Sequence, residues 1–392
     1  MSSEAPSFAR RSHGWMGIKR GHRARPLEWI IEKGIQLVSY SAIVMVFLIF
    51  IFVSREAMPI FLGQMDSAAV RPALSVDEAM KLPKEDLRKY LDMTPDEFVK
   101  ADAEVIKMLV DLRIESSANE TTDKDAKLNT TQWSHLLGPY QWTGYTKPEY
   151  IWQPVGTIHK YNIVPLLVGS LKVSFVALAF ALPLALGAAI YVSQLANPRT
   201  KEWLKPAIEL LAGLPSVVLG FFAMIVMATF LQSVFGYATR LNAFLAGIAL
   251  GLAVIPLVFT IAEDALSSVP RSYIQAALAL GSSRWQAAYK IVLPAAIPGV
   301  FAAAVLGFGR ALGETMIVLM TSSASILSWS VFDSARPITA SIAAELAEAV
   351  FDGHHYRILF MLGTLLFAVT FSLNLIGDIV VHRLKRRLEG KA

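Results

Sequence analysis

Residues Ala295 to Met320 read AAIPGVFAAAVLGFGRALGETMIVLM, an apolar run with two charges, Arg310 and Glu314, near its middle. About 20 apolar residues suffice to cross a bilayer as a helix. An ionised side chain at mid-depth costs on the order of a few kcal/mol or more, so a functional role is the first hypothesis for both. At (i, i+4) spacing the two side chains would share one helix face and partly neutralise each other. That face either lines an anion path or holds helices together.

The composition is that of a polytopic membrane protein. Of the 392 residues 54% are hydrophobic and 17% charged, which is too apolar for an ordinary soluble domain. The chain has no cysteine, so disulfides and cysteine-ligated metal sites are excluded. Further uncharged runs of about 20 residues or more predict an all-α protein with six transmembrane helices. Besides Ala295–Met320, these runs are Gly34–Val53, Val173–Ala196, Leu210–Thr239, Leu241–Ala262 and Ile358–Gly377. We expect kinks at the prolines within spans, Pro183, Pro215 and Pro256.

Basic residues predict the orientation of the spans. With the N-terminus in the cytoplasm, the short inside segments hold 18 Lys and Arg, whereas the two short outside loops hold only Arg240, Arg336 and Arg357. This asymmetry satisfies the positive-inside rule and places both termini in the cytoplasm. The first apolar run is too long for a signal-peptide core and indicates a retained signal anchor. The basic residues that precede it are Arg10, Arg11, Lys19, Arg20, Arg23, Arg25 and Lys33.

The long segment from Arg55 to Asn162 then lies outside the membrane. It is acidic, with 13 Lys and Arg against 17 Asp and Glu, and we expect a small helical insert. Two helix starts are indicated, a capping box at Ser75 and Glu78 and a cap, N1 proline and N3 acid at Thr94, Pro95 and Glu97. Residues 119–131 form a polar linker, and residues 133–152 are rich in Trp and Tyr, which suit a membrane interface. The insert either caps the extracytoplasmic loops or docks a binding protein.

The inside loop between the fourth and fifth spans reads EDALSSVPRSYIQAALALGSSRWQAAYKIVLP from Glu263 to Pro294. Two short helical patterns flank Gly281, and a glycine there permits a tight turn between helices. We expect a compact two-helix elbow that fits a groove on a soluble partner and transmits force to the adjoining spans.

This loop resembles the coupling loop of ABC importer permeases, described as EAA, three residues, G, nine residues, I, one residue, LP. The positions that carry the resemblance are Gln275, Ala276, Ala277, Gly281, Ile291, Leu293 and Pro294. Gln275 stands where the family usually has glutamate, which weakens one polar contact. The resemblance implies that residues 271–294 dock on an ATPase subunit. An ordinary amphipathic loop helix is the alternative.

Further stretches resemble the Pst phosphate permeases in particular. They are Ile208–Phe222, Glu263–Leu266, Gly309–Met316, Val164–Ser193 and Ile338–Ala349, and the last resembles the PstC-type subunit. The resemblance implies the type I ABC importer permease core, and it begins at about Trp152. The expected division is a basic cytoplasmic N-terminus (1–33), a first transmembrane helix (34–54), an extracytoplasmic insert (55–162), a permease core (163–381) with its coupling loop (263–294), and a basic cytoplasmic tail (382–392).

The resemblance also implies the partners. A heteromeric phosphate importer of a bacterial plasma (inner) membrane would contain a second, PstA-type permease, two PstB-type ATPases and an extracytoplasmic PstS-type phosphate-binding protein. The chain has no G-x-x-x-x-G-K-[ST] sequence, so it is expected to be a transport subunit without an ATPase site or cofactor, and the partner ATPase would bind ATP and Mg²⁺. The basic tail suits anionic lipid at the membrane surface, and no nucleic acid is expected.

Arg310, Glu314 and Thr315 are the candidates for the substrate path. A guanidinium matches phosphate oxygens bidentately and stays protonated, and Glu314 would prevent permanent anion trapping. The alternative is a buried ion pair that fixes helix register. Glu345 and Glu348 are expected on a solvated loop helix, with a smaller prospect of contact with the binding protein, and the pair His354 and His355 lacks a third metal ligand.

Two other functions remain open. A permease for tungstate or sulfate would present the same arginine to its anion. A self-contained secondary transporter would need no coupling elbow and would show internal repeats with broken helices.

Overall fold

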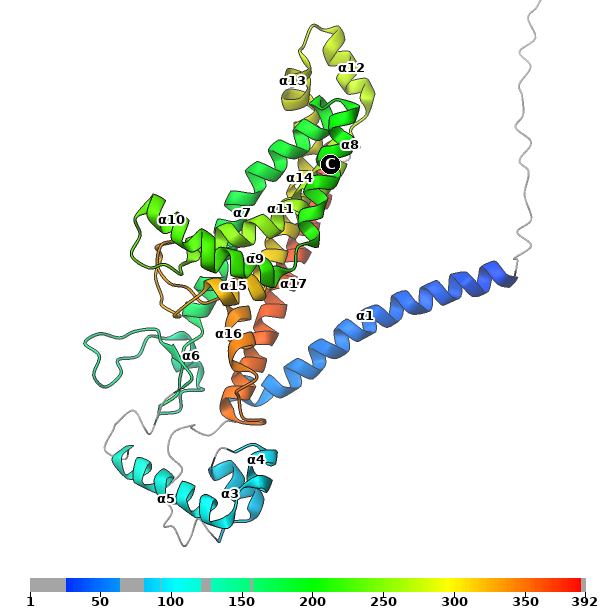
Figure 1. The fold of residues 1–392 in the computed structure, drawn as a ribbon. Coiled ribbons are helices and arrows are strands. Elements are labelled where there is room, and N and C mark those ends of the chain that lie inside the picture. Colours follow the sequence, from blue (N-terminus) through cyan, green and yellow to red (C-terminus); the bar gives the residue numbers. More distant parts are fainter. Residues whose placement is uncertain (1–25, 64–80, 92, 121–127, 156–157, 389–392) are drawn as a thin grey trace, which may run out of the picture. The chain divides into compact units, whose positions relative to one another are not determined.

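The computed structural model describes residues 26–63, 81–91, 93–120, 128–155 and 158–388 (Figure 1). Six helical segments in this part of the chain are long and apolar enough to cross a membrane, which confirms the expected all-α class and the number of spans. The segments are Ile31–Phe61, Val164–Leu195, Ser216–Phe235, Ala243–Ser267, Arg284–Gly313 and His354–Arg386.

The chain divides into two compact units, residues 1–51 and 52–392, and helix α1 (Pro26–Phe61) runs from the first into the second. Within the first unit, the large apolar side chains of α1 from Ile31 to Ile51 are exposed, except Phe50, which is half-buried. This exposure is what a lipid-facing helix requires. The helix ends at Phe61, seven residues beyond the expected end at 54. The basic residues expected before it lie outside the described residues, except Lys33.

Three helices form the centre of the second unit: α7 (Val164–Ile190), α11 (Ala243–Ser267) and α14 (Leu293–Gly313) lie side by side (Figure 1). Small residues permit this close packing, because a Cβ added at Gly251 of α11 would lie 2.7 Å from a ring carbon of Phe180 in α7. Helix α17 (His354–Leu388) packs on α14. The last turns of α1 bury Ala57 and Ile60 in a cluster with residues of α17.

The prolines do not act alike. Pro183 and Pro256 lie inside α7 and α11 as expected. Pro215 is instead the residue before α9 (Ser216–Phe222), and Leu214 ahead of it is extended with a ψ of 127°. A proline disfavours the helical region for its predecessor, and at Leu214 the chain leaves that region, which separates α8 and η3 from α9. The third span therefore begins at Ser216 and not at Leu210, which ends helix α8 (Pro198–Leu210).

A small core of its own joins the short helices α3 (Lys84–Tyr90), α4 (Pro95–Lys100) and α5 (Ala103–Glu120), with Leu87, Tyr90 and Val110 buried. The expected cap of α4 is confirmed, since Thr94 and Glu97 form a reciprocal capping box. The capping box expected at Ser75 and Glu78 lies outside the described residues.

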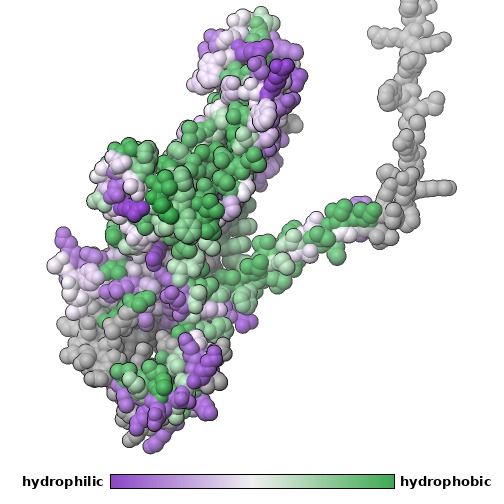
Figure 2. Space-filling model, viewed as in Figure 1, coloured by the Kyte–Doolittle hydropathy of each residue, from purple (hydrophilic) through white to green (hydrophobic). Residues whose placement is uncertain are grey.

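Shorter elements complete the second unit. Strands β1 (Trp152–Gln153) and β2 (Lys160–Tyr161) pair antiparallel, with Trp152 opposite Tyr161. The remaining elements are α6 (Trp133–Leu137), η2 (Tyr191–Leu195), η3 (Leu211–Gly213), η4 (Ala223–Met227), α10 (Ala228–Phe235), α12 (Arg271–Ala279), α13 (Arg284–Ala287), η5 (Ala288–Val292), α15 (Met316–Thr321) and α16 (Ile338–Glu345). Figure 2 shows apolar side chains over the middle of these helices and polar side chains gathered around α12 and α13.

Candidate functional site

The segment between α11 and α14 forms the expected elbow of two short helices. Helix α12 ends at Ala279, and Gly281 adopts a φ of +84°, a backbone conformation that suits glycine. Ser283 then caps α13 in a reciprocal capping box with Gln286, with bonds of 2.9 and 3.2 Å. The chain continues through the π-helical turn η5 into α14. The local sequence therefore accounts for the shape of the elbow, and no contact with a second protein is needed to explain it.

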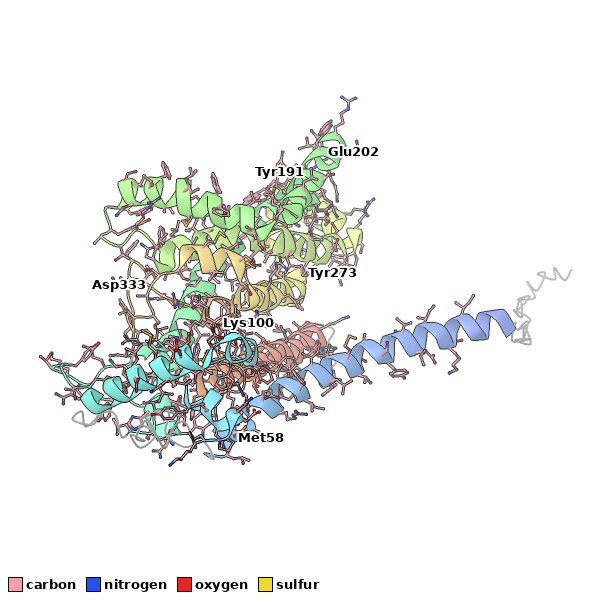
Figure 3. The ribbon with its side chains drawn as sticks, turned by 60° about the horizontal axis from the view of Figure 1, so that its bottom comes forward. Met58, Lys100, Tyr191, Glu202, Tyr273 and Asp333 are labelled. Carbon is pink, nitrogen blue, oxygen red and sulfur yellow. The ribbon has the colours of Figure 1, made fainter. Side chains whose placement is uncertain are left out.

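The candidate coupling residues take up different positions on the elbow. Gln275, Ala276 and Gly281 are exposed, whereas Ala277 is buried. Of the residues that end the pattern, Ile291 and Leu293 are half-buried and Pro294 is exposed. The large apolar side chains that the elbow leaves exposed are Tyr273, Leu278, Leu280, Trp285 and Tyr289. Tyr273 is labelled in Figure 3, where Asp333 lies at the other end of the helices. An exposed apolar surface of this kind is typical of a protein interaction site.

A buried carboxylate fixes the end of α11 from which the elbow departs. Glu263, with its side chain 2% exposed, accepts hydrogen bonds from Lys201 at 2.9 Å and Lys205 at 2.7 Å, both on α8. Ser267 donates a third at 2.9 Å. The hydrogen bond to Glu263 raises the pKa of Lys205 above its ordinary value. We call Glu263, Lys201 and Lys205 the α8–α11 clamp.

A second contact supports the same junction. Gln194 of η2 donates to the carbonyl oxygen of Leu266 at 3.2 Å, and α13 also packs on η2. These contacts join the elbow to η2 at the end of α7 and to the end of α11, which the α8–α11 clamp joins to α8. From the sequence, Glu263 is recognised only as part of the run Glu263–Leu266 that resembles the Pst permeases. A signal for the clamp is present in the sequence. Lys201 and Lys205 stand at (i, i+4) spacing in one inside segment, and Glu263 follows directly on the fourth expected span, at the same side of the membrane.

The expected geometry of Arg310 and Glu314 was wrong. Helix α14 ends at Gly313, and Glu314 is extended with a ψ of 135°, so the run Ala295–Met320 is two helices and not one. Thr339 of α16 donates to the Glu314 carbonyl oxygen at 2.8 Å, which provides a partner outside the helix. The ion pair still forms, with 3.9 Å between the guanidinium and the carboxylate, but across the break. The Arg310 side chain is 52% exposed and that of Glu314 is 11% exposed.

Thr315 lies in the same break but in a different setting. Its hydroxyl donates to the Gly313 carbonyl oxygen at 3.4 Å. It lines a cavity of about 540 Å³ between the break, α16 and α17, whose other walls are chiefly apolar side chains such as Ile342, Leu346 and Leu366. That cavity offers an anion few hydrogen-bond donors. The structure thus pairs Arg310 with Glu314. Thr315 follows Glu314 in sequence but lines the apolar cavity.

Glu345 is buried, so the expectation that it lies on a solvated helix face was wrong. Its carboxylate accepts from Trp152 Nε1 at 3.1 and 3.3 Å and pairs with Arg336 at 3.2 Å and His355 at 3.5 Å. Burial raises its pKa above the ordinary value. The cover comes from β1 and from the start of α17, which are remote in sequence. Glu348, on the turn after α16, is exposed as expected.

Comparison with known proteins gives a family match, two relatives and a solved structure. Residues 181–390 match the family described as binding-protein-dependent transport system inner membrane component. The probable ABC transporter permease protein YqgH of Bacillus subtilis (strain 168) is 33% identical over 221 residues, which cover 56% of this chain and 72% of the relative. The phosphate transport system permease protein PstC of Pasteurella multocida (strain Pm70) is 32% identical over 264 residues, covering 61% of this chain and 80% of the relative. Among solved structures, an inward-facing MetNI methionine ABC transporter is 19% identical with a TM-score of 0.45, covering 57% of this chain and 95% of its own.

Proposed function

The chain belongs to the family of binding-protein-dependent transport system inner membrane components, and we propose that it is a permease subunit of an ATP-driven phosphate importer. The observation that carries this proposal is the elbow, an exposed apolar surface that continues from the end of α11, which the α8–α11 clamp holds to α8. The similarity to PstC permeases over 80% of one such relative favours phosphate as the substrate and the PstC-type subunit as the role.

The proposal includes the partners of such an importer. A PstA-type permease would complete the path, two PstB-type ATPases would bind ATP and Mg²⁺, and a PstS-type protein would deliver phosphate. The elbow suits the ATPase contact because Leu280 and Trp285 are large, apolar and exposed, which fits insertion into a groove. In this arrangement the elbow and both termini lie in the cytoplasm, and the residues of the 55–162 insert lie on the opposite side.

Arg310 is the proposed anion contact within the membrane. Its guanidinium is half exposed in the single chain, and it lies in the last turn of α14 at a helix break. A guanidinium offers paired donors to phosphate oxygens and keeps its charge. Glu314, 3.9 Å away, competes with the anion for those donors, so phosphate is bound transiently and released.

Coupling follows from the connection between the two sites. Helix α14 carries the elbow at one end, through η5, and Arg310 at the other. Closure of the ATPases on the elbow would therefore displace the helix whose far end holds the anion contact. In this mechanism the helices alternate between an outward-open and an inward-open state. The binding protein and the nucleotide can shift the equilibrium between these states only if each binds one state more tightly than the other.

The test is phosphate uptake by the reconstituted importer with Arg310→Gln, beside Arg240→Gln as a control on an exposed loop. We expect Arg310→Gln to abolish uptake while the complex still assembles, and Arg240→Gln to leave uptake unchanged. Loss of assembly, or rescue by exchanging Arg310 and Glu314, would show that the two residues serve pairing and not transport.

Two measurements separate the alternatives. Competition of uptake by tungstate or sulfate more strongly than by unlabelled phosphate would identify a different oxyanion as the substrate. Purification of the tagged chain without any ATPase subunit, with uptake intact, would identify a secondary transporter.

A further inference from the structure

A polar cavity of about 560 Å³ lies beside the extended segment that follows α15. It is lined by Ile151, Trp152, Gln153, Ser322, Ser323, Ala324, Ser325 and Arg336, all in the second unit. No acidic residue is among them. This cavity is distinct from the apolar one beside Thr315 and from the Arg310–Glu314 pair.

The segment Ser322–Ser325 presents hydrogen-bond donors that the described part of the chain does not use. The hydroxyls of Ser322 and Ser323 make no hydrogen bond within the described residues, and neither do the backbone N–H groups of Ser323 and Ala324 with another backbone group. Their carbonyl oxygens, by contrast, are occupied. That of Ser323 accepts from Arg336 Nε at 3.1 Å, and that of Ala324 accepts from Ser334 at 2.8 Å. The hydroxyl and backbone N–H groups of this segment therefore remain available to an anion in the cavity.

Arg336 is held in place at the wall of the cavity. Besides the bond from Nε, its Nη1 pairs with Glu345 at 3.2 Å, and the side chain remains 33% exposed. Its backbone packs closely on Gly169 of α7, where an added Cβ would lie 2.9 Å from the Arg336 carbonyl oxygen. Nη2 has no hydrogen-bond partner in the described part of the chain. A preorganised guanidinium with unused donors favours an oxyanion.

Glu345 does not oppose the anion, because its charge is already engaged. Trp152 donates to it, and Arg336 and His355 lie beside it, so its carboxylate is buried behind the wall. It orients the arginine without lining the cavity.

We propose that this cavity is a receiving site for inorganic phosphate on the extracytoplasmic side, used before the anion reaches Arg310. The inference rests on the proposed function, which places the segment between the fifth and sixth spans outside. The six residues of α15 separate Ser322 from the Glu314–Thr315 break, a rise of about 9 Å. The cavity therefore lies one short helix away from the proposed membrane contact.

The chain's lack of cysteine provides the experiment. Ser323→Cys places a single thiol at the cavity, and Ala238→Cys places one on an exposed loop elsewhere. Each variant is assembled into the full importer in proteoliposomes and labelled on this chain with a charged thiol reagent, with increasing inorganic phosphate or with chloride at equal ionic strength. Phosphate uptake by the same proteoliposomes is measured in parallel.

We expect phosphate to slow the labelling of Ser323→Cys, by about tenfold at ten times the dissociation constant, and to leave Ala238→Cys unaffected. Ser322→Cys serves as the second cavity variant if Ser323→Cys does not assemble. Unchanged labelling at both cavity positions in proteoliposomes that take up phosphate would overturn the receiving site alone. Absence of phosphate uptake by the wild-type importer would instead overturn the proposed function.

Discussion

Replacing Glu263 by glutamine removes the charge at the centre of the α8–α11 clamp with almost no change in shape. The matched control is Asp264→Asn, the next residue, whose side chain is 69% exposed and lies 3.9 Å from the same Lys205. Both variants lose one negative charge near Lys205, and Glu263→Gln loses it near Lys201 as well. They differ in burial, since the Glu263 side chain is 2% exposed.

The expected magnitude follows from the two lysine bonds. A hydrogen bond to a charged group contributes roughly 1.5–3 kcal/mol, and a neutral bond about 0.5–1.5 kcal/mol. In the variant the amide oxygen still accepts from one lysine, with a loss of about 1–1.5 kcal/mol. The amide NH2 group cannot accept from the other lysine, whose bond is lost at about 1.5 kcal/mol, so the sum is about 2.5–3 kcal/mol. This is less than the roughly 3–5 kcal/mol for breaking a fully buried pair, because both lysines remain partly exposed and regain water. For Asp264→Asn we expect at most about 1 kcal/mol, the range of exposed pairs.

The assay is thermal unfolding of the purified importer in detergent, together with phosphate transported per ATP hydrolysed. At about 2–4 °C per kcal/mol, Glu263→Gln should lower the midpoint by roughly 5–10 °C, and Asp264→Asn by much less. The looser clamp should also raise ATP hydrolysis that is not accompanied by transport. If the two variants had equal effects on the unfolding midpoint and on phosphate transported per ATP, the stabilising role of the α8–α11 clamp would be refuted.

Three further outcomes are expected. Gly251→Ala should destabilise the protein by about 1–3 kcal/mol, because the added Cβ would lie 2.7 Å from a ring carbon and 3.1 Å from a carbonyl oxygen of α7. In the same thermal unfolding measurement the control Gly187→Ala, whose Cβ would have nothing within 4 Å, should be neutral or stabilising. Burial raises the pKa of Glu345, so its contribution to stability is present at low pH and is lost as pH rises through the folded-state pKa. The melting temperature of the wild type, relative to that of Glu345→Gln, should therefore rise on acidification from neutral pH. A difference in melting temperature that does not change with pH would contradict this. Ser283→Ala removes the cap of α13 at a cost of about 1 kcal/mol and should lower transport per ATP, whereas Ser282→Ala should not; equal transport by the two would exclude a role for the cap.

Much of the elbow could be predicted because its determinants are local. A glycine at the turn and a Ser–Gln pair three residues apart specify a tight bend and a helix start within a few residues. The same holds for the cap at Thr94. The start of the third span was missed, although Pro215 carries the signal, because hydropathy alone does not register a missing N–H group.

The charged residues were harder to place, because their settings depend on contacts between distant segments. Glu345 receives its hydrogen bond from a tryptophan 193 positions away, so nothing in the helix around it indicates burial. The Arg310–Glu314 pair was found by spacing. The small and apolar residues around it do not show that α14 ends at Gly313 or that Thr339 donates to the freed carbonyl oxygen of Glu314.

The sequence by itself determined the six spans. In lipid each span must satisfy its own backbone hydrogen bonds as a helix, and a helix needs about 20 apolar residues to cross the bilayer, a run that can be recognised in the sequence. It also determined the elbow between the fourth and fifth spans. Only the tertiary structure decided where the charges act: Glu263 in a clamp, Glu345 behind the wall of a polar cavity, and Arg310 at a helix break. The physical reason is that burial and ion pairing are set by which distant segments meet, and a periodic apolar pattern fixes the existence of a helix without fixing its neighbours.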